Sequence, residues 1–293
     1  MQVKDILQKT TQFFRNKGIE TARLDSELLI SAVLNWERMK LYLNYEYPLT
    51  EDEVSACREF VRRRSQGEPV AYILGKRDFY NHTFFVNSSV LIPRPETEHI
   101  VEEATKWIKT SELQAPRLID FGTGSGCLGL SLLAESSESK LVAVDISKGA
   151  IEVAAKNAES LSLSDRVHFI EHDVAELQVD QVSPLLGGLA DVIVANPPYI
   201  AENDPQVEAN VKKFEPATAL FSPEQGLQHI KLWAAKAAEL LRGGGFIMFE
   251  IGHEQGRAAR DIFEATGSFT GVQIVKDLSG RERFVRALRS EEN

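Results

Sequence analysis

The stretch of sequence that decides the fold is RLIDFGTGSGCLGLSLLAE, residues 117–135. Its first five residues are mostly apolar, and a short apolar run that ends in a turn signal is typical of a buried strand. Glycines at 122, 124 and 126 follow, and glycine lets a backbone turn sharply or approach a ligand closely. Apolar residues then resume with helical spacing. A strand, a glycine loop and a helix in this order predict the ligand-binding corner of an open parallel sheet.

Strand and helix patterns alternate beyond this corner. Apolar runs predict strands at 117–121, 140–146, 166–170, 190–196 and 245–251. Helical patterns fall near 127–135, 148–160, 224–241 and 254–266. Such alternation predicts a parallel sheet covered by helices on both faces. Two last strand patterns, 271–277 and 282–288, are separated only by a short turn containing Gly280, so this closing pair must be antiparallel.

The first 76 residues have a different pattern. Apolar residues recur at helical spacing between residues 3 and 66, and Thr50 followed by three acidic residues is typical of a helix start. We therefore predict a small helical domain over 1–76. Aromatic and β-branched residues around an Asn-His pair predict a β-hairpin linker over 77–92. A helix from about 96 to 109 follows, and the α/β domain is predicted to occupy 93–293.

Composition and charge narrow the classes of function. The chain has 293 residues, 43% hydrophobic and 26% charged, which is an ordinary globular composition. Its net charge is −10, and the acidic excess lies beyond residue 85, so we expect no direct contact with nucleic acid. The basic run at 62–64 is interpreted as a solvated helix end.

The sequence also argues against a membrane protein and against a metalloprotein. No apolar run approaches the ~18 residues that span a bilayer, and the first 18 residues lack the apolar core of a secretory signal. We expect a cytoplasmic protein with no membrane partner. The histidines and the two cysteines, Cys57 and Cys127, lack metal-ligand spacing, so we expect no metal. A buried, inert thiol is the preferred interpretation of Cys127.

The glycine loop predicts a bound nucleoside. Its residues are Gly122, Thr123, Gly124, Ser125 and Gly126. The next strand ends in Asp145, and a carboxylate there can accept both hydroxyls of a ribose that lies across the strand ends.

Two alternatives compete for this loop. One is a purely structural glycine turn, and the other is a nicotinamide enzyme, because residues 124–129 spell G-x-G-x-x-G. Asp120 before the glycines would repel a pyrophosphate but suits the cationic amino end of a methionine moiety. The closing antiparallel pair is foreign to dinucleotide domains. S-adenosylmethionine is therefore the predicted cofactor.

The fourth strand of the α/β region runs into Asn196-Pro-Pro-Tyr199. Each proline holds the residue before it extended, and neither has an N–H, so carbonyls are the polar backbone groups. An amide nitrogen is a poor nucleophile because its lone pair is delocalised. The Asn196 side-chain oxygen and the Pro197 carbonyl can each accept one N–H of such a group, while Tyr199 offers a flat face for stacking. Positioning and hydrogen bonding would then carry the catalysis.

With these residues in hand, the chain resembles the release factor glutamine methyltransferases over essentially its whole length. The family's helical front domain carries a motif that residues 66–75 (QGEPVAYILG) match, and the family's linker motif is matched by residues 92–98 (IPRPETE). The glycine loop, Asp145, the tetrapeptide 196–199 and the later segment 214–220 (FEPATAL) also fit.

The resemblance implies a seven-stranded Rossmann-like class I methyltransferase sheet preceded by a small substrate-docking domain. It implies that 122–126, Asp145, Asp173, Val174 and Asn196 bind S-adenosylmethionine, Val174 standing where members can carry an aromatic residue. The target glutamine would be bound by Asn196, Pro197, Pro198 and Tyr199. The substrate would be the Gly-Gly-Gln loop of peptide chain release factors.

Three alternatives share parts of this pattern. A sister family methylates a glutamine of a large-subunit ribosomal protein with the same tetrapeptide, but the linker at 93–98 favours the release-factor branch. DNA amino-methyltransferases also share it, but the acidic charge and the absence of a basic recognition domain oppose that reading. A catalytically dead module would be expected to have lost Asn196 or a loop glycine.

Overall fold

The computed structural model of the protein describes residues 1–205 and 207–291. The chain divides into two compact units, Met1–Lys76 and Arg77–Asn293. Each unit has its own buried apolar clusters.

The first unit is helical, as predicted. Its helices are α1 (Val3–Asn16), α2 (Ala22–Val33), α3 (Arg38–Leu43), α4 (Glu51–Ser65) and α5 (Val70–Leu74). The cap at Thr50 is present, because its hydroxyl accepts the Glu53 N–H and the Glu53 carboxylate accepts the Thr50 N–H. The arginines at 62–64 each bind a carboxylate, of Glu59, Glu68 and Asp25 in turn. This basic run is therefore already neutralised within the unit.

A short hairpin opens the second unit. Its strands are β1 (Lys76–Phe79) and β2 (His82–Phe85), so the regular hairpin is shorter than the predicted 77–92. The Asn157 side chain bonds both the N–H and the carbonyl of Phe85, at 2.7 and 3.0 Å. The Asn157 amide thus forms the two hydrogen bonds that a neighbouring strand would otherwise make with Phe85.

The remaining strands form one seven-stranded sheet in the described residues, in the order β5-β4-β3-β6-β7-β9-β8. They are β3 (Arg117–Phe121), β4 (Lys140–Asp145), β5 (Val167–Glu171), β6 (Ala190–Ala195), β7 (Leu241–Glu250), β8 (Phe269–Lys276) and β9 (Glu282–Arg289). All neighbouring pairs from β5 to β7 are parallel, whereas β9 is antiparallel to both β7 and β8. The predicted closing antiparallel pair is confirmed.

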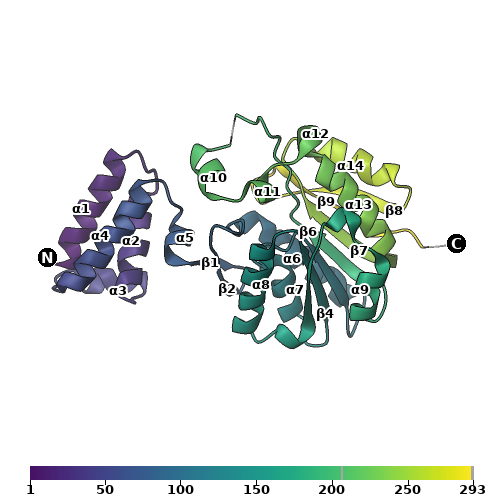
Figure 1. Ribbon diagram of the computed structural model, residues 1–293, viewed down its shortest axis with the longest axis horizontal. Helices are drawn as coiled ribbons and strands as arrows, with labels where there is room; N and C mark the ends of the chain where they lie inside the picture. The colour runs from purple at the N-terminus through teal and green to yellow at the C-terminus, as the bar shows by residue number, and fades with distance from the viewer. Residues whose placement is uncertain (206, 292–293) are drawn as a thin grey trace. The chain divides into compact units, whose positions relative to one another are not determined.

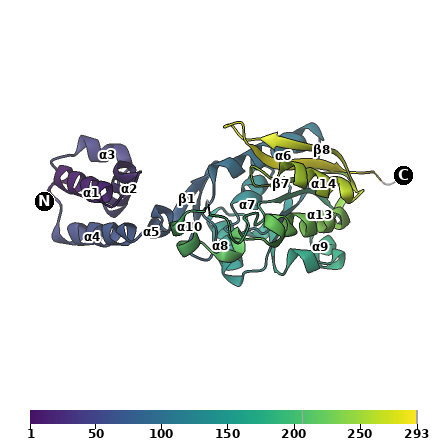
Figure 2. The ribbon, with the colours of Figure 1, turned by 90° about the horizontal axis from the view of Figure 1, so that it is seen from above.

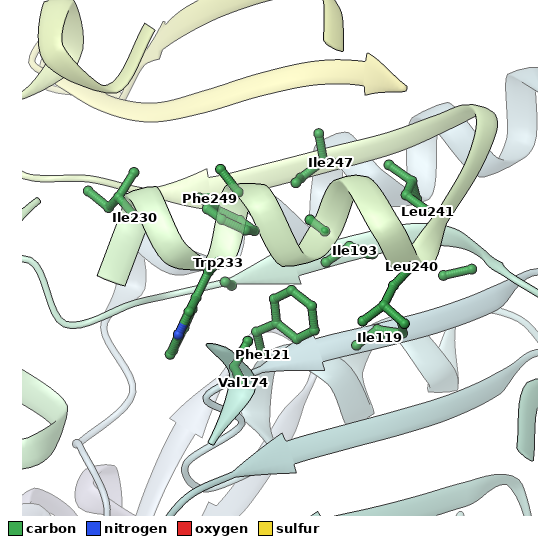
Figure 3. Close-up of a cluster of buried hydrophobic side chains, with 14 of the residues drawn as sticks. Ile119, Phe121, Val174, Ile193, Ile230, Trp233, Leu240, Leu241, Ile247 and Phe249 are labelled. Atoms are coloured by element: carbon green, nitrogen blue, oxygen red, sulfur yellow. The ribbon is translucent and has the colours of Figure 1, made fainter. Parts of the chain in front are cut away.

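Helices cover both faces of this sheet (Figures 1 and 2). They are α6 (Glu98–Thr110), α7 (Cys127–Ala134) and α8 (Lys148–Ser160) over one apolar cluster, and α9 (Val179–Leu186), α13 (Gln228–Leu240) and α14 (Gly256–Ala265) over the other. In the second cluster Trp233 of α13 lies edge-on to Phe121, their ring centroids 6.1 Å apart (Figure 3). Short elements complete the unit: η1 (Pro95–Thr97), η2 (Ser164–Arg166), η3 (Val174–Glu176), α10 (Ala209–Phe214), α11 (Ala217–Leu220) and α12 (Pro223–Gly226).

One helix prediction needs correction, and one helix was not predicted. The helix predicted over 224–241 begins only at Gln228, because Glu224, Gln225 and Gly226 all have positive φ. Helix α9 was not predicted, since Pro184 inside it interrupts the sequence signal.

Candidate active site

A pocket opens beyond the carboxyl ends of the parallel strands. The chain leaves the central strand β3 for β4 and β5 on one side and returns to β6 and β7 on the other. Ligands of open α/β sheets bind at such a switch point. The pocket encloses about 1020 Å³ when its opening to solvent is counted.

Most of the predicted site residues meet in this pocket. Those that line it are Gly122, Thr123, Gly124, Ser125, Asp145, Asp173, Val174, Asn196 and Pro198. Three predicted residues are not part of its lining, namely Gly126, Pro197 and Tyr199. The residues predicted from the sequence therefore lie together at the carboxyl ends of β3, β4, β5 and β6.

The glycine loop has a conformation that side chains would disturb. Gly122, Gly124 and Gly126 have φ of +65°, +56° and +81°. A Cβ at Gly122 would lie 2.6 Å from the Trp233 ring, and one at Gly126 would lie 2.7 Å from Leu130. The loop is therefore shaped by both backbone conformation and close packing.

Asp145 joins the glycine loop to the end of β4. One carboxylate oxygen accepts the Gly124 N–H at 2.9 Å and the other accepts the Ser147 N–H at 2.9 Å. Burial raises the pKa of Asp145, and these backbone hydrogen bonds oppose that rise. Each oxygen retains a lone pair, so the carboxylate can still accept two ligand hydroxyls.

Asp120 lies beneath the same loop and is fully buried. One of its oxygens accepts the Thr123 hydroxyl at 2.7 Å and the Gly129 N–H at 3.0 Å. Burial raises the pKa of Asp120 to about 7. Its charge is therefore sensitive to pH and to any cation in the pocket.

The segment after β5 and helix α13 form another wall of the pocket. Asp173 caps η3 by accepting the Ala175 N–H at 2.8 Å, and Val174 is buried in the core beside Phe121. His229 lines this wall and bonds the buried Ser222 hydroxyl through its Nδ1, at 2.7 Å. Burial lowers the pKa of His229, which favours the neutral imidazole.

Asn196 stands where β6 ends. Its side-chain Nδ2 donates to the Thr97 hydroxyl at 3.4 Å. The Thr97 hydroxyl donates to Glu250 at 2.6 Å, and the Tyr199 hydroxyl donates to the other Glu250 oxygen at 3.0 Å. Burial raises the pKa of Glu250, while the two hydroxyl donors and the charge of Arg283 act in the opposite direction.

The backbone after the tetrapeptide is clamped by residues of α12 and the loop after β7. Gln255 Nε2 donates to the Tyr199 carbonyl at 2.9 Å, and its Oε1 accepts the Gly252 N–H at 2.8 Å. Gly226, with φ of +87°, lies so close that a Cβ there would be 2.0 Å from the Tyr199 carbonyl oxygen. The left-handed turn at 224–226 therefore packs directly against the backbone of Tyr199, the last residue of the tetrapeptide.

The two motifs at 92–98 and 214–220 bind each other at the pocket. Glu215 accepts the Ile92 N–H at 3.1 Å and the Arg94 guanidinium at 2.6 Å. Glu215 is buried, so the ion pair fixes the linker motif against the segment after β6.

Sequence reasoning gave no site role to Glu250, His229 or Trp233, and it included Thr97 only as part of the motif at 92–98. Glu250 had a usable signal, since it is a carboxylate that ends an apolar strand, as Asp145 is. His229 and Trp233 lie on a helix face and carry no comparable signal.

Within 1–205 and 207–291, no group of three or more His, Cys, Asp or Glu side chains could hold a metal. No helix in the same ranges is long and apolar enough to cross a membrane. Burial raises the pKa of Cys127 to about 12, which favours the thiol over a nucleophilic thiolate.

Comparison with known proteins assigns the chain. Family profiles for the PrmC N-terminal domain and the methyltransferase small domain match residues 5–75 and 101–243. The release factor glutamine methyltransferase of Chlorobaculum tepidum is 38% identical over 96% of this chain and 95% of its own. The chain belongs to the release factor glutamine methyltransferases. The enzyme of that name from Leptospira interrogans is 40% identical over 96% of each chain.

Membership of this family confirms the resemblance read from the motifs. The fold is the seven-stranded Rossmann-like methyltransferase sheet with an antiparallel closing pair, preceded by a helical unit. A crystal structure of a release factor-specific protein-(glutamine-N5) methyltransferase from Alicyclobacillus acidocaldarius is 29% identical. It covers 71% of this chain and 99% of its own, with a TM-score of 0.43.

Proposed function

We propose that the protein transfers a methyl group from S-adenosylmethionine to the side-chain amide nitrogen of a glutamine, in the Gly-Gly-Gln motif of peptide chain release factors. Family membership supports the reaction and the substrate class. The observation that carries the proposal is the position of Asn196, whose amide lines the same pocket as the glycine loop and Asp145. One pocket can therefore bind a nucleoside and orient an amide beside it.

The residues of the pocket fit the cofactor. S-adenosylmethionine supplies an electrophilic methyl group on a sulfonium ion. We assign its ribose to the free lone pairs of Asp145 and its methionine end to the loop at 122–126, above the Asp120 carboxylate. The crowding of Gly122 against Trp233 leaves backbone, rather than side chains, facing the ligand. Asp173 and Val174 would border the adenine.

Asn196 and Pro197 would orient the nucleophile. The glutamine amide has two N–H groups, and the Asn196 Oδ1, which lines the pocket, can accept one. We propose that the Pro197 carbonyl accepts the other, although Pro197 is not part of the pocket lining. Accepting these hydrogen bonds raises the electron density on the nitrogen and aims its lone pair at the methyl carbon. As the nitrogen–methyl bond forms, the sulfur–methyl bond would break, and the amide nitrogen would release one proton to water. The residues of the tetrapeptide therefore act by positioning and by hydrogen bonding to developing positive charge on the amide.

Pro198 and Tyr199 would complete the substrate-binding side. Pro198 lines the pocket, whereas the Tyr199 hydroxyl is bound to Glu250. We propose that the Tyr199 ring, held by this bond, limits where the planar amide can lie.

The helical unit would dock the protein substrate. The pocket that holds the predicted chemistry is lined only by residues of the second unit, between 89 and 233. The first unit exposes large apolar side chains, including Met39 and Leu43, that its own core does not use. We propose a cytoplasmic enzyme whose partners are release factors, without direct binding of nucleic acid.

The test is a substrate panel with methyl-labelled S-adenosylmethionine. The panel contains a release factor, the same factor with the motif glutamine changed to glutamate, a large-subunit ribosomal protein and duplex DNA. We expect label only in the unchanged release factor. Label in the ribosomal protein or in DNA, and none in the release factor, would assign the enzyme to one of the other families.

A further inference from the structure

A chain of hydrogen bonds runs behind the Asn196 side chain. It links Tyr199, Glu250, Thr97 and Asn196 in that order, at 3.0, 2.6 and 3.4 Å. These residues come from the loop after β6, the end of β7, and η1 before α6. Thr97 and Glu250 are each only 2% exposed. Segments about 50 to 150 residues apart in sequence therefore meet at one buried point.

The direction of these hydrogen bonds is fixed by the chemistry of the groups. The Thr97 hydroxyl donates to one Glu250 oxygen and the Tyr199 hydroxyl donates to the other. A threonine hydroxyl has one hydrogen, and that of Thr97 is already donated to Glu250. Toward Asn196, Thr97 can therefore only accept. The Asn196 group that faces it must be the NH₂.

This direction decides which end of the Asn196 amide faces the pocket. The oxygen and the NH₂ of an amide have nearly the same shape, so packing alone does not choose between them. With the NH₂ facing Thr97, the oxygen is left for a ligand. With the amide turned over, the NH₂ would face the two N–H groups of the substrate amide. Two donors would then meet, and the substrate nitrogen would lose its acceptor.

We infer that Thr97 and Glu250 are positioning residues that hold the Asn196 amide with its oxygen toward the substrate nitrogen. This inference rests on the proposed function. Thr97 lines the pocket, whereas Glu250 does not. Both are assigned a role through the Asn196 amide and not on the reacting atoms. Glu250 also holds the Tyr199 hydroxyl, so one buried carboxylate orients both ends of the tetrapeptide.

Three substitutions separate orientation from simple packing. Thr97→Val keeps the shape but removes the hydroxyl, whereas Thr97→Ser keeps the hydroxyl. Glu250→Gln keeps the shape but introduces an NH₂ that can donate to Thr97, which frees the threonine hydrogen for the Asn196 oxygen. Thr105→Val is the matched control, because Thr105 is buried on α6 and its hydroxyl has no hydrogen-bond partner among the described residues.

The measurement is the single-turnover rate of methyl transfer to a release factor, with the Kd for S-adenosylmethionine determined separately. We expect Thr97→Val and Glu250→Gln to lower the rate about 10- to 100-fold, the scale for misplacing a reacting group. The Kd should change less than about threefold because the cofactor contacts remain. Thr97→Ser and Thr105→Val should retain rates near that of the wild type.

A double-mutant cycle tests whether Thr97 acts through Asn196. In an Asn196→Ala background, adding Thr97→Val should cost little further rate, because the group it orients is gone. Full additivity of the two losses would overturn the inference, as would wild-type rates in both Thr97→Val and Glu250→Gln. Equal loss in Thr97→Val and Thr97→Ser would also overturn it. A wild-type enzyme that does not methylate the release factor would instead overturn the proposed function.

Discussion

Gly226 offers a sharp test of how the tetrapeptide is held. Its φ is +87°, and an added Cβ would lie 2.0 Å from the Tyr199 carbonyl oxygen and 2.6 Å from Gln255 Nε2. The left-handed backbone alone costs an alanine about 1–2 kcal/mol. Separating the overlapping atoms adds about 1–3 kcal/mol, the usual range for overpacking. We expect Gly226→Ala to destabilise the protein by about 2–5 kcal/mol and to lower turnover, because the Tyr199 backbone must move.

Gly187→Ala is the matched control. Gly187 has a similar φ of +76°, but nothing lies within 4 Å of an added Cβ. It should cost only the backbone term of about 1–2 kcal/mol and leave turnover unchanged. The free energy of unfolding is measured by urea denaturation of both variants, and turnover is measured on a release factor. Equal destabilisation and equal turnover in the two variants would refute the close contact between Gly226 and Tyr199.

Three further predictions concern the cofactor, pH and the helical unit. Asp145→Ala should weaken S-adenosylmethionine binding by about 1–3 kcal/mol in calorimetry, the cost of leaving hydrogen-bond partners unsatisfied; unchanged affinity would remove Asp145 from the site. Burial raises the pKa of Asp120 from 3.8, the value of an unperturbed aspartate, to about 7 in the folded protein. Between these pH values the folded protein holds a proton that the unfolded chain has lost. The contribution of Asp120 to the free energy of unfolding should therefore fall by about 2–3 kcal/mol as pH rises from 5 to 7. Denaturation curves of Asp120→Asn should lack this part of the pH dependence. The same pH dependence in the wild type and in Asp120→Asn would contradict the prediction. Residues 77–293 alone should bind cofactor but methylate an intact release factor poorly, and full activity would refute the docking role.

Much of the second unit could be predicted because its signals are local. The apolar runs that become β3 and β6 are fully or nearly fully buried, and the residues that follow them reach the pocket. A parallel sheet brings the carboxyl ends of its strands to one edge, so Asp145 and Asn196 could be placed together without coordinates. The short turn before β9 likewise required the antiparallel pair.

The remainder depends on contacts between distant segments. The left-handed turn at 224–226 has no signal apart from Gly226, which lies against the carbonyl of Tyr199, a residue about 27 positions earlier in the chain. Helix α9 contains a proline, which argues against a helix in any local reading. The link from Glu250 to Thr97 spans 153 residues and could not be inferred from spacing.

The central claim is that Asn196 orients the substrate amide and does not merely support the cofactor pocket. The most direct measurement is single-turnover methyl transfer to a release factor by Asn196→Ala and Asn196→Asp, with the Kd for S-adenosylmethionine determined for each. Asn196→Ala should lower the rate about 10²–10³-fold, as loss of one preorganised polar partner does, with little change in Kd. Asn196→Asp should lose less because it retains an acceptor, although its negative charge attracts the sulfonium most strongly in the ground state and so does not speed the reaction. A wild-type rate in Asn196→Ala, or a rise in its Kd that accounts for the whole loss, would contradict the claim.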